Sequence, residues 1–199
     1  PVEPGAPTPP IGVLPGGVDA VFIGNPTNPT GWLHARSDLL AAGEGRLLVV
    51  DEAFMDAAGE EESLIEPDMP GRLVLRALSK TWGLAGLRVG YAVGDPRLIA
   101  QMERVQPPWS VSSPGLAAMV ATSTPEALDE ARRMFINVSD RRERLLSLLR
   151  EAGFDTVPSA APFVLIDTGG IGPESVRPRL AEAGFAVRRG ESFPGLGPT

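Results

Sequence analysis

Short apolar runs alternate with helix-like stretches along the first half of the chain, and this alternation restricts the fold more than any other feature. The apolar runs read as buried strands at 19–24, 46–50, 72–77 and 87–93. Helical spacing predicts a helix at 34–43, between the first two runs, and another at 95–105, after the last run. Because strands that alternate with helices pair side by side in parallel, the sequence predicts an α/β fold with a largely parallel sheet.

The pattern changes near residue 125. Residues 125–152 carry apolar side chains at helical spacing among arginines and glutamates, and Gly153 offers a stop. We expect this long helix to lead from a larger domain, 1–124, into part of a smaller α/β domain, 125–199. The remaining predicted elements are a linker at 1–18, helices at 114–122 and 173–183, and strands at 162–167 and 185–188.

Charge and cysteine content exclude several classes of function. The net charge of −7 argues against a nucleic-acid surface, which needs clustered positive charge. Residues 51–68 hold eight carboxylates and no basic residue, which we interpret as a solvated loop. There is no cysteine, so disulfides and thiolate metal sites are excluded, and we expect no metal site. No apolar run is long enough to span a membrane and no targeting segment is visible, so we expect a cytoplasmic protein without membrane partners.

Lys80 is the only lysine among the eighteen basic side chains of the chain. A lysine amine can lose its proton and condense with an aldehyde, whereas arginine can do neither. This asymmetry favours Schiff-base chemistry at Lys80. The alternative is an arginine-rich composition in which one surface lysine has survived without a role.

Polar side chains follow the predicted strands at the points where these end. Asn25 to Gly31 follow the run that ends at Gly24, and Asp51 directly follows the run 46–50. In open α/β sheets the carboxyl ends of the strands form the edge where ligands bind. A turn or a helix cap would explain each of these residues singly, so the prediction of a ligand site rests on their combination.

The run from Ala77 to Gly90 resembles the lysine signature of class I/II aminotransferases, which are pyridoxal-phosphate (PLP) enzymes of fold type I. The resemblance implies that Lys80 binds PLP covalently and that Ser79 and Arg88 bind its phosphate. Ala77 departs from the usual serine or glycine at the first signature position, so one phosphate-binding hydroxyl is missing.

Two upstream motifs extend the resemblance. Asn28, in an Asn-Pro-Thr-Gly turn, is implied to lie beside the phenolic oxygen of PLP, and Asp51 beneath its pyridine nitrogen. A carboxylate at that place keeps the ring nitrogen protonated, which maintains the electron sink, while a neutral amide donates to the phenolate without a competing charge. Lys80 and Asp51 are therefore the predicted catalytic residues.

Phe54 replaces the tyrosine that is common in the aspartate motif, and it cannot donate a hydrogen bond. The version Asp-Glu-Ala-Phe, together with Pro-Trp-Ser-Val at 108–111, resembles the threonine-phosphate decarboxylases of cobalamin biosynthesis, relatives of histidinol-phosphate aminotransferase. In that branch an arginine that matches Arg188 binds the substrate's phosphate; the alternative is that Arg188 and Arg189 are a surface pair at a strand end. We therefore expect decarboxylation of threonine phosphate; the alternatives are transamination of a substrate such as histidinol phosphate, or a catalytically silent fragment.

The resemblance begins well inside the family's length, so we expect the chain to be incomplete at both ends. The missing parts would hold a phosphate-binding glycine loop, an aromatic residue that stacks on the cofactor and an arginine for the substrate carboxylate. The family also completes its sites across a homodimer, which the resemblance implies here. We expect the chain alone to be inactive. His34, the single histidine, is predicted to be exposed.

Overall fold

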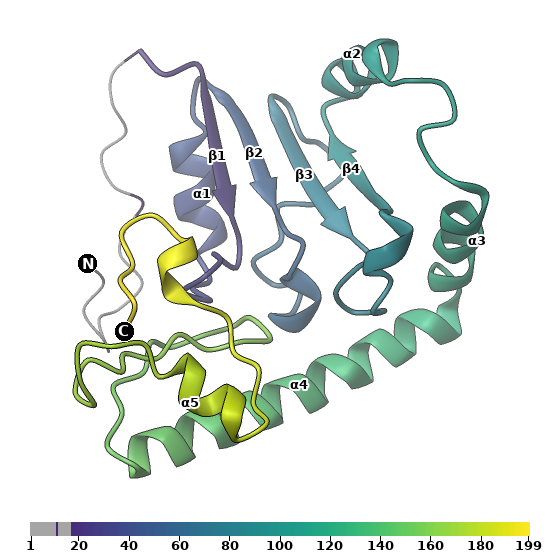
Figure 1. Ribbon diagram of the computed structural model, residues 1–199. Coiled ribbons are helices and arrows are strands. Elements are labelled where there is room, and N and C mark those ends of the chain that lie inside the picture. The colour runs from purple at the N-terminus through teal and green to yellow at the C-terminus, as the bar shows by residue number, and fades with distance from the viewer. Residues whose placement is uncertain (1–10, 12–16) are drawn as a thin grey trace.

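The computed structural model describes residue 11 and residues 17–199, and a four-stranded mixed sheet forms its centre (Figure 1). The strands lie in the order β1 (Ala20–Gly24), β2 (Leu47–Asp51), β3 (Arg72–Ala77) and β4 (Gly90–Gly94). β1, β2 and β3 are parallel, and β4 pairs antiparallel to β3. The predicted α/β fold with a largely parallel sheet is confirmed. Most of the predicted linker at 1–18 lies outside the described residues.

Helices and 3₁₀ turns connect the strands. α1 (Arg36–Ala42) joins β1 to β2, and η1 (Met55–Ala57) follows β2. β4 begins later than predicted because η2 (Ala85–Leu87) and the left-handed Arg88, with φ of 52°, occupy the start of the expected run. α2 (Pro96–Val105) and α3 (Ser113–Thr122) follow, and the side chains of Asp95 and Ser112 cap their N-termini.

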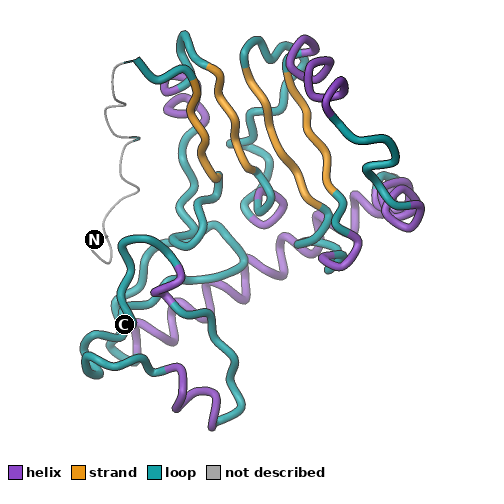
Figure 2. Tube along the Cα trace, turned by 45° about the horizontal axis from the view of Figure 1, so that its top comes forward, coloured by secondary structure: helices purple, strands orange, loops and turns teal. Residues whose placement is uncertain are grey.

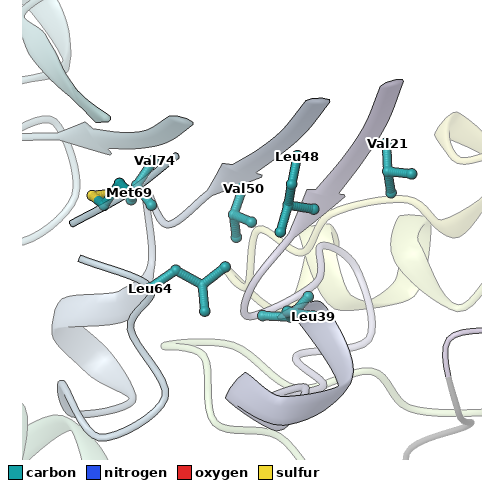
Figure 3. Close-up of a cluster of buried hydrophobic side chains, with 7 residues drawn as sticks. All are labelled: Val21, Leu39, Leu48, Val50, Leu64, Met69 and Val74. Carbon is teal, nitrogen blue, oxygen red and sulfur yellow. The ribbon is translucent and has the colours of Figure 1, made fainter. Parts of the chain in front are cut away.

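The hydrophobic core lies between the sheet and α1 (Figure 3). Alternate residues of the strands face this layer, and Leu39 of α1 points toward them. Leu39, Leu48, Val50, Leu64 and Val74 are completely buried. Removing this apolar surface from water stabilises the sheet and so fixes where the strand ends lie.

α4 (Pro125–Glu151) is a long helix that runs past the edge where β1, β2 and β3 end (Figures 1 and 2). The Thr124 hydroxyl caps its first turn, and Leu146 is its one buried residue. The helix contacts η1, and Arg142 donates to the carbonyl of Ala57 at 3.4 Å and to that of Ala160 at 2.9 Å. α4 thus packs against the loop that follows β2.

The C-terminal region contains less regular structure than the sequence predicts. α5 (Arg177–Glu182) begins later than expected, with proline in its first turn, and η3 covers Gly190–Ser192. The strands predicted at 162–167 and 185–188 are wrong. Within 17–199, the first segment forms only one bridge, between Ile166 and Thr156, and the second forms none. A strand needs a hydrogen-bonded neighbour along its length. The first segment is joined to 155–157 only near its C-terminal end, by bonds from Val157 N to Leu165 O at 3.3 Å and from Asp167 N to Asp155 O at 3.4 Å, and among the described residues no neighbouring strand pairs with the second segment.

None of the helices among the described residues combines the length and the apolar character that a membrane span requires. The division at 124/125 coincides with the start of α4 and stays a prediction, since no observation separates the two parts as domains.

Candidate functional site

Three of the predicted site segments meet at one edge of the sheet. Beyond the strands the hydrogen bonds continue: Asn25 N donates to Asp51 O at 2.9 Å, and Glu52 N donates to Leu75 O at 2.9 Å. The asparagine turn, Asp51 and the Ser79-Lys80 segment therefore leave the sheet side by side. Because β4 runs the opposite way, Arg88 approaches the same edge from the start of its strand.

Asn28 lies at the exposed tip of the turn after β1. A bond from Gly31 N to Thr27 O at 2.7 Å closes this turn. Gly31 adopts a φ of 76°, a left-handed conformation that favours glycine. The turn thus holds an exposed amide on a constrained backbone.

Asp51 is the last residue of β2 and its side chain is exposed. Its Oδ1 accepts a hydrogen bond from Ala53 N at 3.0 Å, which fixes the orientation of the carboxylate against its own backbone. Among the described residues Asp51 makes no ion pair, so its negative charge is available to a cationic group.

Lys80 is exposed, and its Nζ lies 5.0 Å from the centre of the Phe54 ring. The Phe54 ring in turn meets Phe163 edge-on, with centroids 5.1 Å apart. A cation above an aromatic face is attracted by the ring's quadrupole, so phenylalanine at position 54 supports the amine although it cannot donate a hydrogen bond. The Lys80 amine also makes no ion pair within 17–199.

A pocket of about 590 Å³ opens between α4 and the loop that carries Ser79, Lys80 and Thr81, which we call the lysine loop. Ser79 and Lys80 line it together with Phe54, and Glu130 and Arg133 of α4 form part of its opposite wall. Asn28, Asp51, Arg88 and Arg188 are not among its lining residues. The structure therefore places Lys80 and Ser79 in one pocket, while Asp51 and Asn28 share only the strand edge with them.

The two predicted phosphate-binding arginines are both exposed. Arg88 donates to the carbonyl of Ala85 at 3.2 Å, next to the lysine loop. Arg188 donates to the hydroxyl of Ser192 at 3.3 Å and stacks on Phe193, 5.2 Å from the ring centre. Arg188 thus contacts its own segment and not the pocket at Lys80.

A buried ionic cluster, formed by Arg76 with Glu52, Asp56 and Glu60, lies near the carboxyl ends of β2 and β3. The sequence did not lead us to predict it. Glu52 and Arg76 are 1% and 7% exposed and pair at 2.9 Å. Arg76 also pairs with Asp56 at 3.0 Å and with Glu60 at 2.5 Å. Burial lowers the pKa of Arg76, but the hydrogen bond to Glu60 and the three nearby carboxylates raise it more, and the net pKa lies above the ordinary value.

The interpretation of 51–68 as a solvated acidic loop is therefore wrong in part. Glu52 is buried, where its Oε1 accepts from Leu64 N at 2.8 Å and its Oε2 from the Ser63 hydroxyl at 2.8 Å. The sequence did contain a signal: Arg76 interrupts an apolar strand at a position that should face the interior, and a buried charge needs a partner.

His34 is half-buried, so its predicted exposure is also wrong. Its Nε2 lies 3.2 Å from the Thr27 hydroxyl, inside the asparagine turn. Burial lowers the pKa of His34, and the nearby charge of Asp38 raises it by a smaller amount.

The parallel strands β1, β2 and β3 of this α/β fold end at one edge of the sheet, where Asn28, Asp51 and Lys80 present an exposed amide, carboxylate and amine. Residues 12–195 match the family described as aminotransferase class I and II, and the chain belongs to this family. The family is PLP-dependent, and the fold is fold type I. Both expectations drawn from the resemblance are confirmed.

The chain is similar to a histidinol-phosphate aminotransferase of Mycobacterium tuberculosis, with 43% identity over 185 residues, or 92% of this chain and 50% of the relative. The chain spans about half the length of the curated relatives it matches. Histidinol-phosphate aminotransferase from Sinorhizobium meliloti, solved with pyridoxal 5′-phosphate, has a TM-score of 0.74 and 27% identity, covering 86% of this chain and 49% of that one.

L-threonine-O-3-phosphate decarboxylase from Porphyromonas gingivalis is also similar in structure. Its TM-score is 0.73 and its identity 22%, and the match covers 95% of this chain and 60% of the decarboxylase. At this level of identity the likeness concerns the fold.

Proposed function

We propose that this chain forms part of an aminotransferase that binds PLP on Lys80 and acts on a phosphorylated amino substrate such as histidinol phosphate. The observation that carries the proposal is the exposed Lys80 amine above Phe54, on the strand edge that also presents Asp51. The similarity to histidinol-phosphate aminotransferases supports the choice of reaction over decarboxylation.

The donor set at this edge fits PLP. When bound, the cofactor supplies an aldehyde for amines and a ring that withdraws electrons from the substrate's α-carbon. Asp51, with no competing cation among the described residues, would keep the ring nitrogen protonated, and the exposed amide of Asn28 would donate to the phenolic oxygen. The Ser79 hydroxyl and the Arg88 guanidinium would hold the phosphate.

Lys80 would have two tasks. Its amine would hold the aldehyde of the bound cofactor, and when free it would carry a proton at the substrate's α-carbon. The Phe54 ring would support the amine as a cation–π partner, and it would make no hydrogen bond to the cofactor because it has no donor. Arg188 would bind the substrate's phosphate; this requires its side chain to leave Ser192, which lies in its own segment.

Decarboxylation of threonine phosphate is the second candidate, and two features of this chain favour it. Phe54 and the exposed Trp109 belong to motifs that resemble the decarboxylase branch. The distinction depends on which bond of the substrate's α-carbon stands perpendicular to the cofactor ring. Substrate orientation therefore decides the reaction.

The proposal extends to residues outside this chain. The chain spans about half of its relatives, so we propose that a homodimer and further segments complete the site, and that the chain alone binds the cofactor without turnover. The contrasting possibility is a silent fragment that folds but does not hold PLP. A cytoplasmic location stays a prediction.

The first experiment tests the anchor. The chain is incubated with PLP, reduced with borohydride and digested, and mass spectrometry locates the pyridoxyl group. We expect the label on Lys80, and no label in Lys80→Arg, since arginine keeps the charge but cannot form the imine. An unlabelled wild-type chain would support the silent fragment.

The second experiment tests the reaction, on a protein that carries this chain at the full length of its relatives. Histidinol phosphate with 2-oxoglutarate should yield glutamate without loss of carbon dioxide. Release of carbon dioxide from threonine phosphate alone would assign the decarboxylase reaction instead. An Arg188→Ala variant should weaken binding of the phosphorylated substrate far more than that of its dephosphorylated analogue.

A further inference from the structure

The buried ionic cluster connects the loop that follows Asp51 to the loop that carries Lys80. Its centre is Arg76 of β3, four residues before Lys80 in the sequence. The Arg76 Nε donates to Glu52 Oε2 at 3.0 Å, and its Nη1 donates to Asp56 Oδ1 at 3.0 Å. Glu52 directly follows Asp51, so one end of the cluster holds the backbone of the predicted cofactor aspartate.

The other end of the cluster reaches the lysine loop through Asp56. Its Oδ1 accepts from Arg76, and its Oδ2 accepts from the hydroxyl of Thr81, which is adjacent to Lys80. With both oxygens engaged, this carboxylate cannot rotate without breaking one of the two bonds. Asp56 belongs to η1, which packs against α4, so its backbone is held as well.

Stability alone is a weak explanation for this arrangement. Burying charged groups costs free energy of folding. A buried ion pair often stabilises a protein no more than well-packed apolar side chains of similar volume would. The cluster nevertheless places a guanidinium against three carboxylates, and among the described residues Asp56 is the one of the three that also accepts a hydrogen bond from the loop that carries Lys80. Glu60 pairs with the same guanidinium, yet its side chain is 64% exposed and its hydrogen bonds among the described residues go to Arg76.

We propose that Asp56 is a positioning residue, which holds Thr81, and with it Lys80, at a fixed place relative to Asp51. Arg76 orients the Asp56 carboxylate, and the Thr81 hydroxyl transmits that orientation to the lysine loop. The inference rests on the proposed role of Lys80 as the cofactor anchor. It assigns to the loop after β2 the task of holding the loop that carries Lys80.

Thr81→Val is the direct test, because valine keeps the shape of threonine and removes the hydroxyl. Thr81→Ser restores the hydroxyl and serves as the rescue. Glu60→Gln is the matched control, since it neutralises a carboxylate on the same guanidinium without touching the lysine loop. Each variant of the 199-residue chain is compared by thermal unfolding, which reports any general loss of stability.

Two readouts report on the loop itself. The first is hydrogen exchange without cofactor at Gly83, whose N–H donates to Lys80 O at 3.2 Å. The second is the rate at which PLP labels Lys80, measured by borohydride quenching at timed intervals and mass spectrometry. A charge-assisted hydrogen bond corresponds to roughly tenfold in an equilibrium, so we expect Thr81→Val to speed exchange and slow labelling by about that factor.

These outcomes distinguish a failure of the positioning role of Asp56 from a failure of the proposed cofactor role of Lys80. Rescue by Thr81→Ser, with Glu60→Gln near wild type in both readouts, supports the positioning role. Equal changes in Thr81→Val and Glu60→Gln, in proportion to lost thermal stability, would overturn it, as would an unchanged Thr81→Val. If the wild-type chain is not labelled at Lys80, the cofactor assignment fails, and exchange at Gly83 still tests the link between Asp56 and Thr81.

Discussion

The side chain of Asn25 and the backbone of His34 are joined by two hydrogen bonds. His34 N donates to Asn25 Oδ1 at 2.8 Å, and Asn25 Nδ2 donates to His34 O at 3.3 Å. Asn25 is completely buried, so its amide group is shielded from water. Together they tie both ends of the turn that exposes Asn28.

Asn25→Ala should therefore destabilise the chain. The change leaves the backbone N–H and C=O of the half-buried His34 without their Asn25 partners, which costs about 1–3 kcal/mol in the free energy of unfolding. Urea unfolding measures the loss. The matched control is Asn28→Ala in the same turn, where an exposed side chain should change stability by less than about 0.5 kcal/mol. Equal losses in the two variants would contradict the role assigned to Asn25.

Stability should fall on mild acidification because of His34. Burial lowers the pKa of this residue in the folded chain below its ordinary value of 6.5. As the pH falls below 6.5, the unfolded chain binds a proton that the folded chain does not, and the stability contributed by neutral His34 is lost until the pH passes the folded pKa. His34→Gln should remove this part of the pH dependence. Urea midpoints between pH 7 and pH 5 that fall equally in both proteins would disprove it.

Gly31→Ala should cost more than Gly45→Ala, although both glycines have positive φ, of 76° and 70°. A methyl group at position 31 would collide with the side chain of Ser159, while nothing lies within 4 Å at position 45. Overpacking costs about 1–3 kcal/mol beyond the backbone strain that both variants share. Thermal or urea unfolding of the pair gives the difference, and a difference near zero would show that Ser159 moves aside freely.

Leu39→Ala should be the most destabilising of these changes. Leu39 is completely buried under the sheet (Figure 3), and truncating a buried leucine costs about 2–5 kcal/mol. The neighbouring Leu40 is 36% exposed, so Leu40→Ala is a control with the same chemical change. A similar loss of stability in both variants would mean that α1 does not pack as described.

Asp51→Asn tests the proposed cofactor site. The variant should still be labelled by PLP at Lys80, but in a protein of the relatives' full length its turnover should fall by orders of magnitude. The amide cannot hold the ring nitrogen protonated, which weakens the electron sink. Steady-state assays with the variant measure the loss, and near-normal turnover would remove Asp51 from the catalytic residues.

The sequence predicts the strand edge well because local patterns encode it. Apolar runs mark β1, β2 and β3, and the polar residues that follow them must then lie together. The pairing of Arg76 with Glu52 could not be predicted in this way. The two residues lie 24 positions apart, and no periodic pattern in the sequence indicates which distant residues will meet. The failed strands at 162–167 and 185–188 have a similar cause: an apolar run shows a capacity for strand formation, but its partner decides the outcome.

The order of the sheet has a consequence for the behaviour of the chain in solution. Within 17–199, β1 and β4 each pair with a single strand, so their outer backbone groups remain available to another strand. Phe22 on β1 is 73% exposed and Tyr91 on β4 is 43% exposed, and neither edge strand carries a charged side chain. Such edges are templates for strands of other molecules, and we expect the chain to self-associate as its concentration rises.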